Sequence, residues 1–121
     1  MGKYAVLLSA GPDRTGSALN GVEYALRLAD GGHDVRVYLD GRATRWPREL
    51  ATRADHPLRD GLDRAVSGEV SVAACAYCAA AFDAATGCHE AGIPLLGTAG
   101  EEHGPDVAAL VDDGYELLTM S

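Results

Sequence analysis

Short apolar segments alternate along the chain with longer segments of helical periodicity. The short segments are continuous apolar runs or alternate between two faces, as where Val35, Val37 and Leu39 all face one side, and both patterns are typical of strands. The predicted strands cover residues 3–9, 35–39, 70–74, 93–96 and 115–120. The predicted helices cover residues 18–30 after a cap at Ser17, then 47–53, 57–67, 77–90 and 105–111.

This alternation predicts an α/β fold, with a five-stranded, mainly parallel sheet between helices in a three-layer α/β/α arrangement. The 121 residues suffice for one hydrophobic core, so we expect a single domain over residues 1–121. Right-handed crossovers leave few topologies, and we predict the flavodoxin-like strand order 2-1-3-4-5. In that order, the functional crevice lies between the carboxyl ends of the first and third strands.

Charge and hydropathy exclude several classes of partner. Acidic residues outnumber basic ones 18 to 10, for a formal net charge of −8 at pH 7, so we expect no binding to nucleic acid. The longest apolar run, residues 72–82, is shorter than the ~20 residues that span a membrane, so no membrane association is expected. The N-terminal residues lack the pattern of a secretory signal, and a cytoplasmic location is the default expectation.

Two of the three cysteines stand close together, in Cys75-Ala76-Tyr77-Cys78. An odd number of cysteines at this spacing suits reduced, reactive thiols better than a disulfide framework. Cys75 follows the third predicted strand, where it would open onto the crevice, and precedes a helix whose N-terminal amides favour a thiolate. Cys78 lies next to it on one helical face, so the pair can exchange sulfur or close a disulfide. We therefore predict Cys75 and Cys78 as the catalytic residues.

Other interpretations of the cysteines and histidines stay open. A cysteine in an Ala-rich segment is often a small buried hydrophobe, and the Cys-x-x-Cys spacing also occurs in metal sites. Cys88 and His89 would complete a zinc site with the pair only if Gly87 broke the predicted helix, so we predict no metal site. The remaining histidines are expected at the surface or as helix caps: His33, His56 and His103.

Two further segments border the predicted crevice. The loop over residues 9–17 could hold an anion at the start of the first helix. It contains neither a P-loop nor a GxGxxG motif, so no cofactor is predicted. Asp40 and Gly41, after the second strand, are interpreted first as a turn and second as a wall of the site.

Three segments carry a family likeness: GHDVRVYLDG (residues 32–41), VSVAACAYC (residues 70–78) and YELLTM (residues 115–120). Together they resemble the DsrE/DsrF-like (DsrEFH) sulfur-relay proteins over nearly the whole chain. The resemblance implies a small α/β protein whose cysteine after the third strand carries sulfur as a persulfide, a role that falls to Cys75 and less directly to Cys78. It also implies a homo- or hetero-oligomer with sulfur-donor and sulfur-acceptor partners. The chain departs from the family over residues 82–92, where relatives usually have a shorter connection with an Arg-Gly pair.

Three functions fit these observations. The first is a sulfur carrier or sulfurtransferase, in which the Cys75 thiolate takes sulfur from a donor persulfide and passes it to an acceptor cysteine. The second is a dithiol redox protein in which Cys75 and Cys78 cycle through a disulfide. The third is a non-catalytic binding module that forms a homo-oligomer and whose cysteines only pack, since a small α/β domain can bury an apolar face against copies of itself.

Overall fold

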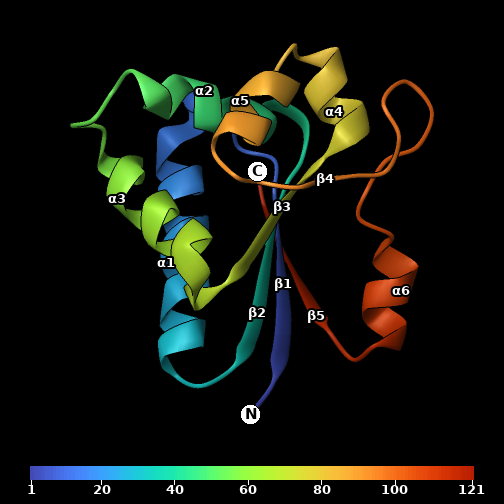
Figure 1. The fold of residues 1–121 in the computed structure, drawn as a ribbon. Coiled ribbons are helices and arrows are strands. Elements are labelled where there is room, and N and C mark those ends of the chain that lie inside the picture. The colour runs from blue at the N-terminus through green and yellow to red at the C-terminus, as the bar shows by residue number, and fades with distance from the viewer.

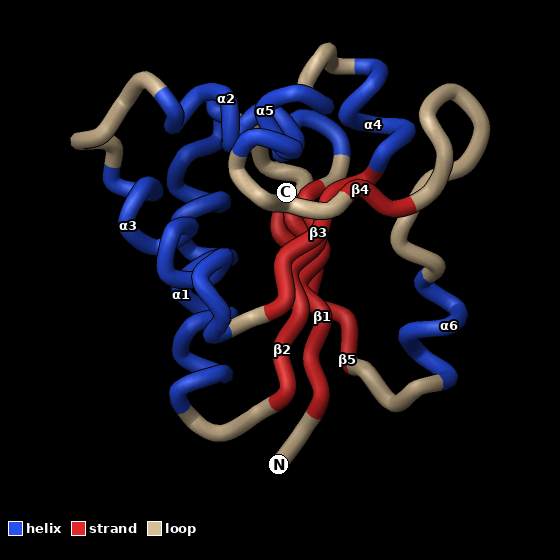
Figure 2. The backbone as a smooth tube through the Cα atoms, viewed as in Figure 1, coloured by secondary structure: helices blue, strands red, loops and turns tan.

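A five-stranded parallel sheet forms the centre of the molecule, with helices on both of its faces (Figure 1 and Figure 2). The computed structural model describes residues 1–121 except for the side chain of Glu69. The strands are β1 (Lys3–Leu8), β2 (Asp34–Leu39), β3 (Ser71–Cys75), β4 (Leu95–Leu96) and β5 (Glu116–Met120). The helices are α1 (Thr15–Asp30), α2 (Trp46–Ala51), α3 (Pro57–Arg64), α4 (Ala76–Ala81), α5 (Ala85–Glu90) and α6 (Val107–Asp112). The predicted three-layer α/β/α fold is confirmed.

The order of the strands differs from the predicted 2-1-3-4-5. The sheet runs β4-β3-β2-β1-β5, which is still a flavodoxin-like, doubly wound arrangement, but β2 rather than β1 is the neighbour of β3. Every ladder between named strands is parallel. The chain therefore adds β2, β3 and β4 on one side of β1 and reverses only before β5. As a consequence, the end of β2 borders the end of β3, which carries Cys75. The prediction of a crevice between the ends of the first and third strands is therefore wrong, because β2 separates β1 from β3.

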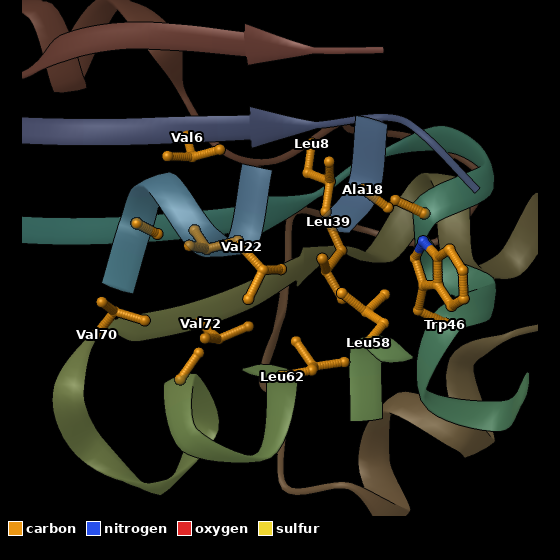
Figure 3. Close-up of a cluster of buried hydrophobic side chains, with 14 of the residues drawn as sticks. Val6, Leu8, Ala18, Val22, Leu39, Trp46, Leu58, Leu62, Val70 and Val72 are labelled. Atoms are coloured by element: carbon orange, nitrogen blue, oxygen red, sulfur yellow. The ribbon is translucent and has the colours of Figure 1, made fainter. Parts of the chain in front are cut away.

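The packing of α1 and α3 explains this order. Val22 of α1 and Leu58 and Leu62 of α3 belong to one hydrophobic cluster, which Figure 3 shows in close-up. Successive right-handed crossovers leave their helices on one face of the sheet only if the strands advance in one direction. The order 2-1-3-4-5 would have placed the helices that follow β1 and β2 on opposite faces, where their apolar stripes could not meet.

The Arg-rich stretch over residues 42–56 contributes the largest fully buried side chain. Trp46, at the start of α2, lies in this hydrophobic cluster (Figure 3) and is 0% exposed. Its Nε1–H donates a hydrogen bond of 2.7 Å to the carbonyl oxygen of Ala10. This bond satisfies the indole donor inside an apolar environment. It also connects α2 to the loop after β1. The position of α2 itself agrees with the short helix predicted over residues 47–53.

The single helix predicted over residues 77–90 is wrong, because this segment forms α4 and α5. Asp83 adopts a positive φ of 53°, and the N–H of Ala84 bonds to the carbonyl oxygen of Ala79 at 2.7 Å. These features form the Schellman pattern with which helices commonly end. The helix is thus broken at Asp83 and not at Gly87. The many alanines around Asp83 favour helix, so the sequence does not indicate that a helix ends there.

Two helix starts differ in how far they match the sequence expectations. α1 begins at Thr15, so Ser17 lies inside the helix and not at its cap. His56 does cap α3, because its Nδ1 accepts a hydrogen bond of 3.1 Å from the N–H of Leu58. The expected capping role of a histidine is therefore confirmed for His56.

The second face of the sheet is covered more thinly than the first, mainly by α6 (Figure 1). Its buried cluster is small and consists of Ala5, Tyr38, Ala73, Leu110 and Tyr115. Among the helices that the structure describes, none combines the length and the apolar character needed to cross a membrane.

Candidate functional site

The carboxyl edge of the sheet brings together three side chains that can bind metals or carry sulfur: Cys75, Cys78 and His103. Nδ1 of His103 lies 3.7 Å from Sγ of Cys75 and 3.7 Å from Sγ of Cys78. The two sulfurs and the ring nitrogen all lie within 4.8 Å of one another. The predicted cysteine pair thus meets a histidine from a distant loop, and we call these three residues the Cys–His cluster.

Cys75 forms the inner part of the Cys–His cluster. It ends β3 and caps α4, and its Sγ accepts a hydrogen bond of 3.3 Å from the N–H of Cys78. The sequence argument expected an amide donor from the start of the helix at this sulfur, and the structure places one there. The side chain is nevertheless 0% exposed, so the expectation that it opens onto the crevice is wrong. The reason is that β3 leads directly into α4, which folds the cap side chain back against the first turn.

Cys78 forms the accessible part of the cluster, since its side chain is only partly buried. Burial raises the pKa of its thiol, a backbone hydrogen bond from Gly41 lowers it, and the neighbouring Cys75 and Asp40 raise it again. The net effect is a raised pKa, so the resting form of Cys78 at neutral pH is the thiol. A base must therefore take its proton before it can act as a nucleophile.

His103 is placed to act as that base. Its ring lies against Tyr77, with the two ring centroids 4.0 Å apart. Depending on which ring nitrogen is protonated, Nδ1 accepts a proton from a thiol or donates a hydrogen bond to a thiolate. The residue is exposed, as predicted, but its contact with the cysteines was not predicted. The available signal was its position after β4, because loops that follow parallel strands gather at the carboxyl edge.

Close backbone packing fixes the loop that carries His103. Thr98 and Glu102 form a short antiparallel bridge, with N···O distances of 2.8 and 2.9 Å. Gly104 passes so close to β4 that a Cβ there would lie 2.6 Å from the β4 backbone, and a Cβ on Gly97 would collide with the carbonyl oxygen of Glu102. Glycine alone permits such approaches, so these two positions determine where His103 stands.

Asp40 adds a carboxylate beside the cluster. Burial raises its pKa to about 6, while the nearby His103 acts to lower it. The same carboxylate raises the pKa of Cys78. Asp40 follows β2, the sheet neighbour of β3, which explains its closeness to the cysteines. The interpretation of Asp40 and Gly41 as a wall of the site therefore agrees with the structure.

Cys88 and His89 lie outside the cluster. Cys88 is fully buried in the main hydrophobic core, where its Sγ donates to the carbonyl oxygen of Thr44 at 3.5 Å. Burial raises the pKa of this thiol to about 11, which keeps it protonated and unreactive. His89 is exposed on α5. The structure therefore does not form the zinc site that would combine these two residues with Cys75 and Cys78.

Cavity size does not locate this site. A groove of about 490 Å³ begins at His103 and continues along α6, where Arg36 and Tyr38 also line it. A larger cavity of about 710 Å³ lies between α2, α3 and α5, and no cysteine or histidine is among its described lining residues. The chemistry of the side chains therefore identifies the Cys–His cluster as the candidate site.

Two adjacent thiols, an imidazole and a carboxylate can support three kinds of chemistry. The accessible thiol can accept sulfane sulfur, and the two thiols can be oxidised to a disulfide. Thiolates and imidazole are also preferred ligands of thiophilic metal ions, so the residues able to hold such an ion are Cys75, Cys78 and His103.

Comparisons with known proteins support the fold. No family model and no curated protein matches the chain. Among solved structures, the chain is similar to BT1422, a conserved protein of unknown function from Bacteroides thetaiotaomicron. The TM-score is 0.68 and the sequence identity 16%, and the match covers 96% of this chain and 94% of that chain. At this identity, the similarity supports the shared architecture alone.

Proposed function

We propose that this protein is a sulfur carrier in which Cys78 receives sulfane sulfur as a persulfide. The observation that carries the proposal is the position of the Cys78 sulfur, which is partly exposed and lies 3.7 Å from Nδ1 of His103. Cys75, which the family resemblance favours, is buried behind it and is not open to a donor protein. The role of first acceptor therefore moves from Cys75 to Cys78, within the predicted pair.

The transfer conserves atoms and electrons. His103 removes the proton of Cys78, and the thiolate attacks the terminal sulfur of a donor persulfide. The sulfur–sulfur bond of the donor breaks as the new bond forms on Cys78, and the donor leaves as a thiolate that takes the proton back from His103. An acceptor thiolate then attacks the terminal sulfur on Cys78 and releases Cys78 as a thiolate. The cycle consumes no external oxidant or reductant.

The proximity of Cys75 favours a second candidate function, dithiol redox chemistry. Its sulfur lies within 4.8 Å of the sulfur of Cys78, and a small rotation would bring the two into bonding distance. If Cys75 attacks the inner sulfur of a Cys78 persulfide, the terminal sulfur leaves as hydrosulfide and a Cys75–Cys78 disulfide forms. Sulfane sulfur is then reduced to sulfide while two thiols are oxidised. Relay therefore requires the acceptor to collect the sulfur before Cys75 reacts.

The proposal includes a setting and partners. The three cysteines are free thiols, which suits the reducing cytoplasm, and the donor and acceptor are proteins with reactive cysteines of their own. We also propose self-association through α6, because Val107 and Val111 lie one helical turn apart and are 46% and 55% exposed. Light scattering on the purified protein should then give a mass above that of one chain, and a monomer would contradict this part of the proposal.

Intact-mass spectrometry after incubation of the reduced protein with a small-molecule persulfide tests the function. We expect a gain of about 32 Da, one sulfur atom, on the unmodified chain. Cys78→Ser should abolish the gain, and Cys88→Ala is the matched control that should retain it. Cys75→Ser should increase the amount of adduct, because the thiol that expels the sulfur is gone.

The other outcomes decide between the alternatives. A loss of two protons that needs both Cys75 and Cys78 would favour the dithiol redox protein. No mass change in any variant would contradict the sulfur carrier and favour the binding module.

A further inference from the structure

We propose that Cys75, Cys78 and His103 form a zinc site with three protein ligands and one open coordination position. The proposal uses the same residues as sulfur transfer but does not depend on it, since it requires only that both thiols be reduced. It also goes beyond the sequence-based prediction of no metal site, which considered Cys88 and His89 as the further ligands and expected His103 at the surface or as a helix cap.

The two sulfur–nitrogen distances match tetrahedral zinc. With Zn–S bonds of about 2.3 Å and Zn–N bonds of about 2.0–2.1 Å, a tetrahedral angle separates sulfur from nitrogen by roughly 3.6 Å. The structure has Nδ1 of His103 at 3.7 Å from each sulfur. All three atoms lie within 4.8 Å of one another. Tetrahedral zinc also requires the two sulfurs to lie roughly 3.8 Å apart, a separation that falls within this limit and within reach of side-chain rotation.

The donor set fits zinc chemically. Two thiolates and one imidazole are typical zinc ligands, and the two thiolates balance the double charge of the ion. Binding transfers the ion into the cluster and releases two thiol protons to solvent, with no change in oxidation state. Oxidation of the pair to a disulfide would remove two of the three ligands, so the site exists only in the reduced protein.

The surrounding groups hold the ligands in place. The N–H of Cys78 bonds to the Cys75 sulfur, and the ring of Tyr77 lies against the imidazole of His103. Such outer partners orient metal ligands and preserve their geometry. Cys75 and Cys78 come from one strand–helix junction, and His103 comes from a loop fixed by Gly104 and its close approach to β4. Two rigid segments therefore present the three ligands.

One coordination position faces outward. Cys75 closes the inner side of the cluster because it is fully buried, whereas Cys78 is partly exposed and His103 is exposed. Zinc sites with three protein ligands keep the fourth position for water or a substrate. Asp40 lies close enough to influence both His103 and Cys78 by its charge. An ion bound here therefore has access to water or to a sulfur ligand from outside.

Metal titration of the full, reduced chain tests the inference. We expect one Zn²⁺ ion per chain in competition with a chromophoric chelator, and with Co²⁺ as a probe we expect a thiolate-to-cobalt charge-transfer band and the intense visible bands of tetrahedral cobalt. His103→Asn should weaken Zn²⁺ binding by at least ~100-fold, because loss of an outer partner alone costs roughly 10–100-fold. His89→Asn is the matched control, since His89 is exposed and outside the cluster, and should bind like the unmodified chain.

Cys78→Ser should lose the charge-transfer intensity of one thiolate and bind more weakly still. His103 is exposed, so its variant keeps the fold and decides the question even if Cys75→Ser does not fold. Substoichiometric uptake by the unmodified chain, or equal affinity of the His103→Asn and His89→Asn variants, would overturn the inference. The persulfide mass gain is a separate measurement made without metal, so failure of the zinc site and failure of the sulfur carrier can be told apart.

Discussion

Cys78 and Cys88 both lie on short helices that follow β3, but their surroundings differ. Cys88 is surrounded by the main hydrophobic core and donates to a backbone carbonyl, so burial raises the pKa of its thiol to about 11. Cys78 is partly exposed and lies beside a second thiol and the imidazole of His103. The adjacent residue His89 gives Cys88 no such partner.

This comparison shows that the chemical surroundings of a cysteine depend on its neighbours in space and not on its neighbours in the sequence. Cys88 and His89 are adjacent in the chain yet form no cluster, whereas His103 reaches Cys75 from a loop that follows another strand. The carboxyl edge of a parallel sheet collects such loops. The contrast between the two cysteines can be tested directly, first through their reactivity and then through the groups that surround them.

The largest expected effect is on the rate of alkylation. In the native protein, iodoacetamide should modify Cys78 and leave Cys88 protected. Because Cys88 becomes accessible only through unfolding, its rate should be at least ~1000-fold lower. Peptide mapping by mass spectrometry measures both rates in one sample, and denaturant serves as the control that makes them equal. Comparable native rates would contradict the difference in burial.

The next effect isolates the imidazole. His103→Asn should slow alkylation of Cys78 at neutral pH by about 100-fold, the lower end of what a positioned base contributes. His89→Asn, the matched control, should leave the rate unchanged. At a pH above the pKa of Cys78 the thiol ionises without help, so the difference between the His103 variant and the unmodified chain should disappear. A difference that persists at high pH would mean that His103 acts on the structure and not on the proton.

The sequence predicts most of the secondary structure but less of the site, for physical reasons. Strands and long helices follow from local periodicity, so β2 with Val35, Val37 and Leu39 and the amphipathic α1 lie where expected. Strand order depends on which face each helix covers, and only the packing of α3 against α1 decides that. The end of α4 near Asp83 was not predicted, because a non-glycine residue that adopts a positive φ cannot be recognised from an Ala-rich sequence.

The candidate site also divides into a part that local sequence predicts and a part that depends on tertiary packing. The Cys-x-x-Cys spacing is local, so Cys75 and Cys78 could be identified from it. The burial of Cys75 and the approach of His103 depend on tertiary contacts between segments distant in the sequence. The approach of His103 depends on Gly104, because the absence of a Cβ there lets the His103 loop lie against β4. The sequence shows a glycine in a loop but does not show which backbone segment that glycine contacts.

A smaller effect should therefore come from Gly104→Ala, which places a Cβ 2.6 Å from the β4 backbone. We expect the loop to shift, the alkylation rate of Cys78 to fall by roughly tenfold and stability to drop by roughly 1–3 kcal/mol, as for other overpacked sites. Gly100→Ala is the control in the same loop, because its Cβ would meet nothing within 4 Å, and its positive φ of 76°, which Gly104 does not share, makes it a control for backbone strain without the contact with β4. Denaturant melts compare the stabilities of the two variants. Equal alkylation rates of Cys78 in the two variants would show that the contact with β4 does not position His103.

The smallest effect concerns Asp40. Burial raises its pKa to about 6 from the ordinary 3.8, so the folded protein resists ionisation of this carboxyl. Stability from this source is complete below pH 3.8 and is lost as the pH rises through about 6. Asp40→Asn removes this loss of stability. Because the carboxyl is partly solvated, we expect the effect of the substitution on the free energy of unfolding to be more favourable by roughly 1 kcal/mol at pH 7 than at low pH. Denaturant melts at several pH values measure this gain, and the exposed Asp55→Asn is the control that should show none.

The ionised Asp40 carboxylate also raises the pKa of Cys78, so the Asp40→Asn variant should form the Cys78 thiolate at lower pH in a thiolate absorbance titration. A pKa of Cys78 that stays the same would mean that Asp40 does not act on the Cys–His cluster through its charge.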